Sequence, residues 1–297
     1  MTSLSMADAA TSVGQCIRAW RQTRGLSQFE LASRAGFSVR HVSFIETGRA
    51  NPSREAMLAL GEVLKLTFRE QNHLLEAAGF ARVFRETPLS ADEMAHMRGM
   101  LQFILDRHLP YAAVVLDRYW NCLLMNRAAT QFFEALTSPT LTNMHGNILR
   151  ATFHPQGTRR WIVNWPEVEQ HLLTHAEIAF GSADDSAGVA LLAEIRSYVG
   201  ASATPQMPPR PGELLLPVHL RMGDLDLRLF STIMTLCRPQ DVTLQELRIE
   251  TWFPADPGSE RCWLEHFAGV RRESFRGVSG ILGVPDRSAA FAEEAAE

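Results

Sequence analysis

The sequence has no apolar segment long enough to span a bilayer. A transmembrane helix needs about 20 consecutive apolar residues, whereas the longest apolar runs here lie at 112–116 and around 214–216. The N-terminus has neither a basic flank nor a long apolar stretch, which argues against a signal peptide. We therefore expect a cytoplasmic protein with no membrane partner.

Cysteine is scarce and scattered. The four cysteines form no CxxC pair and no cluster with histidine at zinc spacing; they are Cys16, Cys122, Cys237 and Cys262. This pattern predicts buried or half-buried thiols in a reducing compartment, and neither disulfides nor a metal site.

Motifs of common enzyme classes are also missing. The sequence contains no GxSxG, HExxH, P-loop or GxGxxG motif in a suitable context, so no catalytic residues are expected. The histidines His171 and His175 lie four residues apart and therefore on one helix face. With no third ligand at a clear spacing, that face is interpreted as solvated.

The net charge of −4 is unevenly distributed. Residues 1–85 contain 11 basic and 7 acidic side chains, a balance of +4, while the remainder contains 18 and 26, a balance of −8. Such asymmetry is typical of a basic nucleic-acid-binding module joined to an acidic module with another role.

The basic part has repeated helix signals. An apolar stripe at helical spacing covers 13–23, and capping boxes at Ser27–Glu30 and Thr67–Glu70 open two further helices. Ser38 and Ser53 are candidate caps for two more. The pattern predicts an all-α domain of five helices over residues 1–85.

The acidic part mixes strand and helix signals. A capping box at Ser90–Glu93 would open a linker helix, placed at 86–107, and helices are expected over 126–136, much of 147–200, and 259–272. Pro217 marks its strand as an edge strand or a bulged one. A Pro-rich loop is expected at 200–212 and a C-terminal tail at 276–297, of which the Ala/Glu-rich part at 289–297 is expected to be frayed. The apolar strand segments are 112–116, 120–125, 214–222, 225–229 and 247–253. An α+β domain over 108–275 with one five-stranded antiparallel sheet is the simplest arrangement.

Residues 26–52, LSQFELASRAGFSVRHVSFIETGRANP, resemble the XRE/Cro-type helix-turn-helix family, with its lambda-repressor-like fold. The resemblance implies binding to double-stranded operator DNA, with the second helix of the motif in the major groove. It also implies that Gln28 donates to a phosphate, and that Arg21 and Glu46 form a structural ion pair.

Side chains early in the second helix of the motif are the candidates for base contacts. Arg40 can make a bidentate contact to guanine, and Val39 can pack on a thymine methyl group. The alternatives are that Val39 and Phe44 belong to the core and that Arg40 is a solvated charge. The candidate DNA-contacting residues are Gln28, Ser38, Val39, Arg40, His41, Ser43, Phe44, Arg49 and Asn51.

Four segments of the acidic part, 110–133, 147–155, 164–165 and 241–256, resemble the MmyB-like ligand-binding domain, a PAS-like fold. The resemblance implies an apolar pocket for a fatty-acid-like ligand, whose carboxylate would suit an arginine fork. The alternative is that the tryptophans are core residues and the arginines exposed charges. The candidate ligand-binding residues are Trp120, Asn126, Arg159, Arg160, Trp161, Asn164 and Trp165.

Taken together, these features predict a ligand-responsive transcription regulator that acts as a homodimer. The helix at 92–107 is the expected coupling element between the two domains, and no cofactor is expected beyond the ligand. Two alternatives are left open: a haem or flavin sensor or an enzyme with an appended DNA-binding module, and a protein–protein adaptor whose helix-turn-helix no longer binds DNA.

Overall fold

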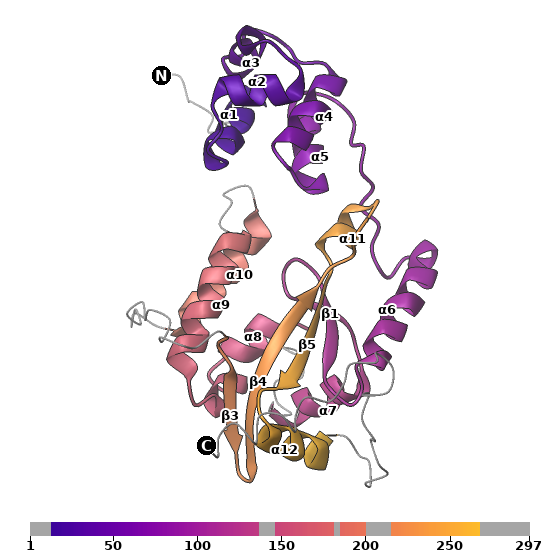
Figure 1. The fold of residues 1–297 in the computed structure, drawn as a ribbon, viewed down its shortest axis with the longest axis vertical. Coiled ribbons are helices and arrows are strands. Elements are labelled where there is room, and N and C mark those ends of the chain that lie inside the picture. Colours follow the sequence, from indigo (N-terminus) through magenta and orange to yellow (C-terminus); the bar gives the residue numbers. More distant parts are fainter. Residues whose placement is uncertain (1–12, 137–145, 181–184, 200–214, 268–297) are drawn as a thin grey trace, which may run out of the picture.

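The computed structural model describes residues 13–136, 146–180, 185–199 and 215–267. These residues form a helical module and an α+β module at opposite ends of the molecule (Figure 1). Within the described part of the chain, no helix is both long and apolar enough to cross a membrane. The predicted loop at 200–212, the tail at 276–297, Leu214 and the end of the expected helix at 259–272 lie outside the described residues.

The N-terminal module consists of five helices, as predicted. Ser27 and Thr67 cap their helices in complete capping boxes with Glu30 and Glu70. The hydroxyl of Ser38 accepts a hydrogen bond from the backbone N–H of His41 in the helix that follows it. Side-chain caps thus begin the helices where the sequence signals place them. The helices are α1 (Val13–Thr23), α2 (Gln28–Ala35), α3 (Val39–Glu46), α4 (Arg54–Val63) and α5 (Phe68–Ala77).

Helices α1 and α3 touch at the level of their backbones. A Cβ atom added to Gly14 would lie 2.4 Å from the carbonyl oxygen of Ile45 and 2.7 Å from that of Glu46. Below this contact, apolar side chains from all five helices or their ends fill one core, including Ile17, Leu31 and Leu60. The position of α3 therefore depends on Gly14 of α1, because glycine has no side chain.

The second module is built on one five-stranded sheet of order β2-β1-β5-β4-β3, in which every pairing is antiparallel. This confirms the predicted sheet. Strand β3 begins directly after Pro217 and lies at the sheet edge, where a missing backbone donor is tolerated. The strands are β1 (Ala113–Leu116), β2 (Cys122–Met125), β3 (Val218–Met222), β4 (Leu225–Met234) and β5 (Arg248–Pro254).

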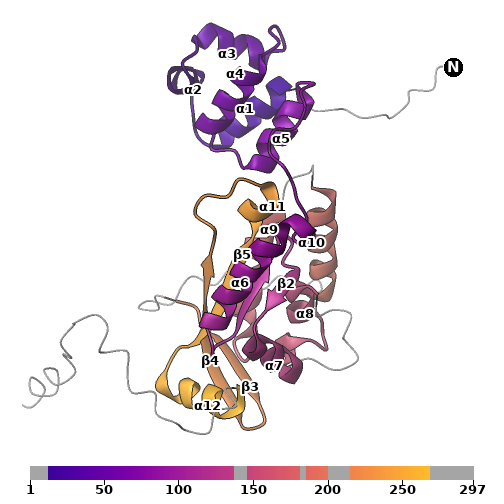
Figure 2. The same ribbon diagram turned by 90° about the vertical axis from the view of Figure 1, so that its right-hand side faces the viewer.

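Helices cover both faces of this sheet. Helix α6 (Ala95–Arg107) lies across one face (Figure 2), where Leu101 and Leu105 pack with Val115 and Ile249. The other face belongs to a larger core. The elements on that side are α7 (Arg127–Leu136), α8 (Ile148–Phe153), η3 (Thr158–Trp161), α9 (Trp165–Phe180), α10 (Ser186–Val199) and α12 (Pro257–Phe267).

The prediction for the start of the second strand was wrong. Trp120 lies in the turn before β2, with φ at 66°, and the strand begins at Cys122. The cause is the carboxylate of Asp117, which accepts hydrogen bonds from the backbone N–H groups of Tyr119 and Asn121 and closes a tight local turn. Strand β4, predicted to end at 229, continues to Met234.

Two further expectations need correction. The Ser90–Glu93 capping box does not form, because Glu93 pairs with Arg85 at 2.7 Å and a 3-10 turn, η1 (Asp92–Met94), precedes α6. Cys237 is exposed, whereas the other three cysteines are buried or half-buried. A short helix, α11 (Val242–Glu246), is also present between β4 and β5.

Candidate DNA-binding face and ligand cavity

The first turn of α3 is exposed. Val39 is 41% exposed, and the guanidinium of Arg40 lies over the ring of Phe44, 5.1 Å from its centroid. Phe44 and Ser43 are half-buried, so they lie at the boundary between the core and this surface. The side chain of Arg40 is therefore accessible and partly ordered by an aromatic neighbour on the same helix.

The remaining candidates surround this turn. Arg49 and Asn51 are exposed in the segment that follows α3. Ser38 accepts from the backbone N–H of His41, whose ring lies 5.4 Å from that of Phe37. The structure thus places these candidates in α3, at its N-cap and in the segment that follows it.

Glu46 is a buried carboxylate held by three donors. Arg21 donates to it from Nε at 2.6 Å and from Nη2 at 3.0 Å, and Gln28 donates from Nε2 at 2.8 Å. Burial raises the pKa of Glu46, but the hydrogen bonds from Arg21 and Gln28 outweigh this and lower it below its ordinary value. One N–H of the Gln28 side-chain amide therefore donates to Glu46 and links α2 to α3.

The second module contains a cavity of about 160 Å³ between the sheet and the helices α7, α8 and α9. Its walls are mainly apolar, and His171 and His175 line it from α9 with their side chains exposed. The exposure of the two histidines agrees with the solvated face inferred from the sequence. The lining residues are Trp120, Phe132, Phe133, Ile148, Leu149, Thr152, Thr158, Ile162, Val168, His171, Leu172, His175, Leu216, Val218, Leu220, Leu229, Ser231, Ile233, Glu250 and Trp252.

Three of the residues that line this cavity each have a buried side-chain polar atom without a hydrogen-bond partner in the described part of the chain: Trp120 Nε1, Thr158 Oγ1 and Glu250 Oε2. Buried polar groups in folded proteins almost always have partners, so three in one cavity is unusual. Burial raises the pKa of Glu250 to about 7, against the opposing effects of a hydrogen bond with Ser231 and the charge of Arg248.

Of the candidate ligand-binding residues, Trp120 lines the cavity. Asn126 is buried and accepts from the backbone N–H groups of Ala113 and Ala129 at 3.2 and 2.9 Å. Asn164 donates to the carbonyl oxygen of Pro217 at 2.8 Å and accepts from the N–H of the residue at 219 at 2.9 Å. Both asparagines thus bind backbone groups.

The two candidate arginines are likewise used elsewhere. Arg159 donates to the carbonyl oxygens of Phe153 and Tyr198, and Arg160 lies over the ring of Trp161. The indole of Trp161 donates to the backbone at 136, and Trp165 packs edge-on against Phe153. None of these four residues is among those that line the described cavity.

Glu250 was missed in the sequence because it alternates with apolar residues in 247–253, the pattern of a side chain directed to solvent. Strand β5 is, however, central in the sheet, and both of its faces are covered. An acidic residue at that position is therefore enclosed. No sequence signal marked Thr158.

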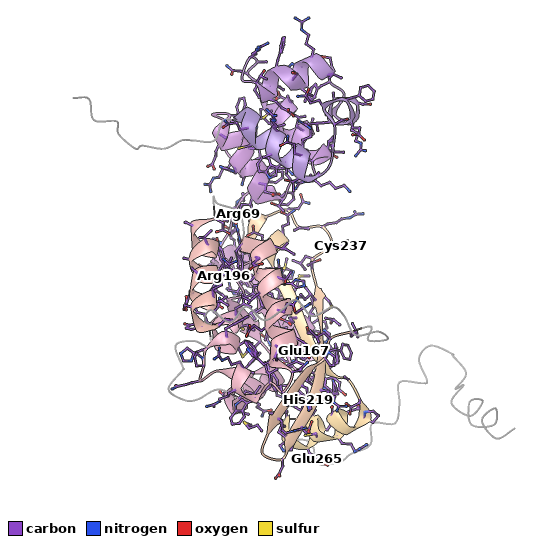
Figure 3. The ribbon with its side chains drawn as sticks, turned by 90° about the vertical axis from the view of Figure 1, so that its left-hand side faces the viewer. Arg69, Glu167, Arg196, His219, Cys237 and Glu265 are labelled. Carbon is purple, nitrogen blue, oxygen red and sulfur yellow. The ribbon has the colours of Figure 1, made fainter. Side chains whose placement is uncertain are left out.

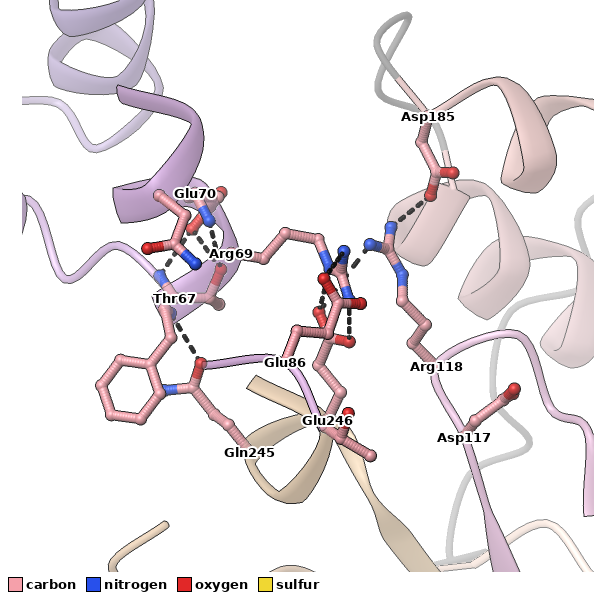
Figure 4. A network of polar contacts seen from close by, with 12 residues as sticks. Thr67, Arg69, Glu70, Glu86, Asp117, Arg118, Asp185, Gln245 and Glu246 are labelled. Carbon is pink, nitrogen blue, oxygen red and sulfur yellow. Dashed lines mark hydrogen bonds and ion pairs between the residues drawn. The ribbon is translucent and has the colours of Figure 1, made fainter. Parts of the chain in front are cut away.

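The two modules meet through α5 and α11. Arg69 donates to both carboxylate oxygens of Glu246, at 2.7 and 2.9 Å, and also pairs with Glu86 (Figure 4). The backbone N–H of Phe68 donates to Gln245 at 2.7 Å. Figure 3 places Arg69 at this junction, far from Glu265 at the opposite end of the second module.

The junction continues toward the cavity by a second route. Arg118 approaches Glu246 at 3.7 Å and pairs with Asp185, which also accepts from the hydroxyl of Tyr119 at 2.9 Å. Arg118 and Tyr119 directly precede Trp120 in the turn described above. Glu246 is itself four residues before Glu250, so α11 and β5 connect the junction to the cavity wall.

Comparison with known proteins assigns a family model to each module. Residues 97–264, more than half of the chain, match the model of the MmyB-like transcription regulator ligand binding domain. Residues 12–74 match a helix-turn-helix domain model. No curated protein matches the chain. Among the described residues, no group of three or more histidine, cysteine, aspartate or glutamate side chains is arranged to hold a metal ion.

Proposed function

Since the chain belongs to the family of the MmyB-like transcription regulator ligand binding domain, we propose that it binds specific DNA sequences under the control of a small, largely apolar ligand. A helix-turn-helix domain joined to this ligand-binding domain is the arrangement of a ligand-modulated, DNA-binding transcription regulator. The cavity with its three unpartnered polar atoms is the single observation that supports a ligand most strongly. The cytoplasm is the proposed location.

The DNA-binding face is proposed to be that of an XRE/Cro-type module, with α3 in the major groove. Arg40 and Val39 are exposed at the N-terminal turn of α3, the part of a recognition helix that reaches base edges. Arg49 and Asn51 are exposed beside it and are proposed to contact phosphates. Gln28 would contribute its second amide N–H to a phosphate at the start of α2.

Replacing Arg40 with alanine is expected to weaken DNA binding by about 5- to 150-fold, because a bidentate contact to a base contributes about 1–3 kcal/mol. Fluorescence anisotropy can measure this with a DNA fragment that the full chain selects from a random-sequence pool. Arg261→Ala, an exposed arginine on α12, is the charge-matched control. Equal affinities of the two variants would refute the assignment of Arg40.

The size of the cavity bears on the ligand. A cavity of about 160 Å³ is close to the roughly 150 Å³ of an engineered apolar cavity that accepts benzene. It therefore has no room for a haem or flavin ring system without a large rearrangement. The fatty-acid-like ligand implied by the family resemblance would suit the apolar walls, but no arginine is among the residues that line the described cavity. A visible absorption band in the purified protein would favour the sensor alternative instead.

Coupling between ligand binding and DNA binding is proposed to act through α11 rather than through the helix at 92–107. Helix α6 packs on the outer face of the sheet, whereas the contacts to α5 come from α11 and the segment around Glu86. A ligand that moves β5 would displace Glu246 and with it Arg69. Such coupling requires that the ligand bind the two arrangements with different affinities.

A homodimer is also proposed. A single helix-turn-helix module covers only one half-site, and dimers read two half-sites about 34 Å apart. Helix α6 leaves Met100 and Phe103 exposed, at 47% and 58%, which supports a contact surface there. Light scattering would support this with a mass of twice 33.2 kDa, and a monomer at DNA-binding concentrations would contradict it.

A further inference from the structure

The unpartnered polar atoms of the cavity have a definite chemical character. Glu250 Oε2 and Thr158 Oγ1 can accept hydrogen bonds, while Trp120 Nε1 can only donate. Glu250 projects from β5 on the same sheet face as Trp252 and the β4 residues Ser231 and Ile233, all of which line the cavity. The acidic side chain thus lies against the sheet floor of the cavity, where it is almost completely buried.

Among the residues that the structure describes, the charged and titratable groups around Glu250 leave its carboxylate without a cationic partner. Ser231 contributes only a hydroxyl, and Arg248, on the same strand, lowers the pKa of Glu250 through its charge but forms no ion pair with it. On α9, His171 and His175 are exposed, and burial together with the charge of His175 lowers the pKa of His171. Among the described residues of this lining, the buried ionisable group is therefore the acidic Glu250.

We propose that the cavity selects a small apolar amine, whose ammonium group donates to Glu250 Oε2 while its apolar part packs between the sheet and α7–α9. This inference rests on the proposed function and names the ligand class for the same cavity. An ammonium group offers three donors and a positive charge, which matches a buried carboxylate and the free acceptor of Thr158. A carboxylate would instead place a second negative charge beside Glu250.

The volume sets the size of a suitable probe. A cavity of about 160 Å³ accepts roughly six to eight non-hydrogen atoms, judged by the benzene-sized occupant of a similar engineered cavity. n-Hexylamine, hexan-1-ol and hexanoic acid meet this limit, and each is an unbranched six-carbon compound. They differ mainly in the charge and hydrogen-bonding capacity of the head group, which makes them a comparable series.

Isothermal titration calorimetry of the full chain at pH 8 tests the proposal. At this pH the Glu250 carboxyl, with its pKa of about 7, is ionised. We expect hexylamine to bind at least about 10-fold more tightly than hexanol or hexanoic acid, because hydrogen bonds to charged groups are the stronger ones. In Glu250→Gln the affinity for hexylamine should fall about 10- to 100-fold, and the affinity for hexanol should change by less than about threefold.

Two further variants keep the test interpretable. Glu265→Gln changes an exposed glutamate of α12 in the same way and should leave all three affinities unchanged. Thr158→Val preserves the shape of the side chain and removes the second acceptor. It is expected to weaken the binding of hexylamine several-fold and tests the cavity independently of Glu250→Gln.

The possible failures separate the two proposals. Two outcomes would refute the proposal of an amine ligand but not the cavity as the ligand site. The first is tighter binding of hexanoic acid than of hexylamine. The second is an equal affinity for hexylamine in the wild type and in both cavity variants. If none of the three compounds binds, the cavity itself is refuted as the ligand site, and the proposed function loses its main support.

Discussion

Replacing Glu250 with glutamine is expected to raise the unfolding free energy of the ligand-free protein by about 3 kcal/mol at pH 8. The pKa of Glu250 is raised from 4.5 to about 7 by burial. One pKa unit corresponds to about 1.4 kcal/mol, and the side chain is buried well enough that the shift is not screened by solvent.

The sign follows from proton linkage. Between pH 4.5 and 7 the folded state holds a proton on Glu250 that the unfolded state has released, so stability falls as pH rises through this range. Glutamine resembles the protonated acid and does not titrate. The stability difference between variant and wild type should therefore be less than about 1 kcal/mol at pH 5 and reach its full size near pH 8.

Urea denaturation of both proteins between pH 5 and 8 measures this difference. Subtracting the free energy of unfolding of the wild type from that of the variant removes the contributions of other titrating groups, such as His171. A difference that does not change with pH would show that the carboxyl group is not held in an apolar, unpaired environment.

Replacing Gly14 with alanine is expected to destabilise the N-terminal module by about 3 kcal/mol, at the upper end of the usual cost of overpacking. The added Cβ would lie 2.4 Å from the carbonyl oxygen of Ile45 and 2.7 Å from that of Glu46, both backbone atoms that cannot turn aside. Helix α3 would have to move away from α1. Because α3 is the proposed recognition helix, DNA binding should weaken as well.

Gly99→Ala is the matched control for this substitution. Gly99 lies within α6 and has no atom within 4 Å of its added Cβ, so alanine should stabilise this helix by about 0.5–1 kcal/mol. Thermal and urea unfolding of the two variants should thus shift in opposite directions. A Gly14→Ala protein as stable as wild type would contradict the close approach of α1 and α3.

Local chemistry explains why the helices and strands were predictable. Capping boxes such as Ser27–Glu30 depend on residues three apart, and the alternating strands fall in one continuous sheet. Helix α11 has only five residues, too few for an apolar period to appear. The turn at Trp120 depends on the Asp117 carboxylate, whose competing hydrogen bonds an apolar pattern does not reveal.

The ligand cavity was much harder to predict from the sequence. Side-chain type alone did not show that Arg159 would bind the backbone carbonyl oxygens of Phe153 and Tyr198. Nor did it show that Glu250 would be enclosed, since this depends on helices from both sides of the sheet. Long-range packing decides both outcomes, and it brings together residues from 120 to 252.

The central claim is that occupancy of the cavity changes DNA binding through Arg69 and Glu246. The most direct test measures the affinity of the full chain for its selected DNA fragment, with and without a saturating amount of the six-carbon probe that binds the cavity most tightly. We expect the probe to change the wild-type Kd by at least about fivefold, the lower range of allosteric coupling. In Arg69→Ala, the change should be less than about twofold, while Arg261→Ala behaves as wild type. A wild-type Kd that is unchanged when calorimetry shows the cavity to be saturated would contradict the claim.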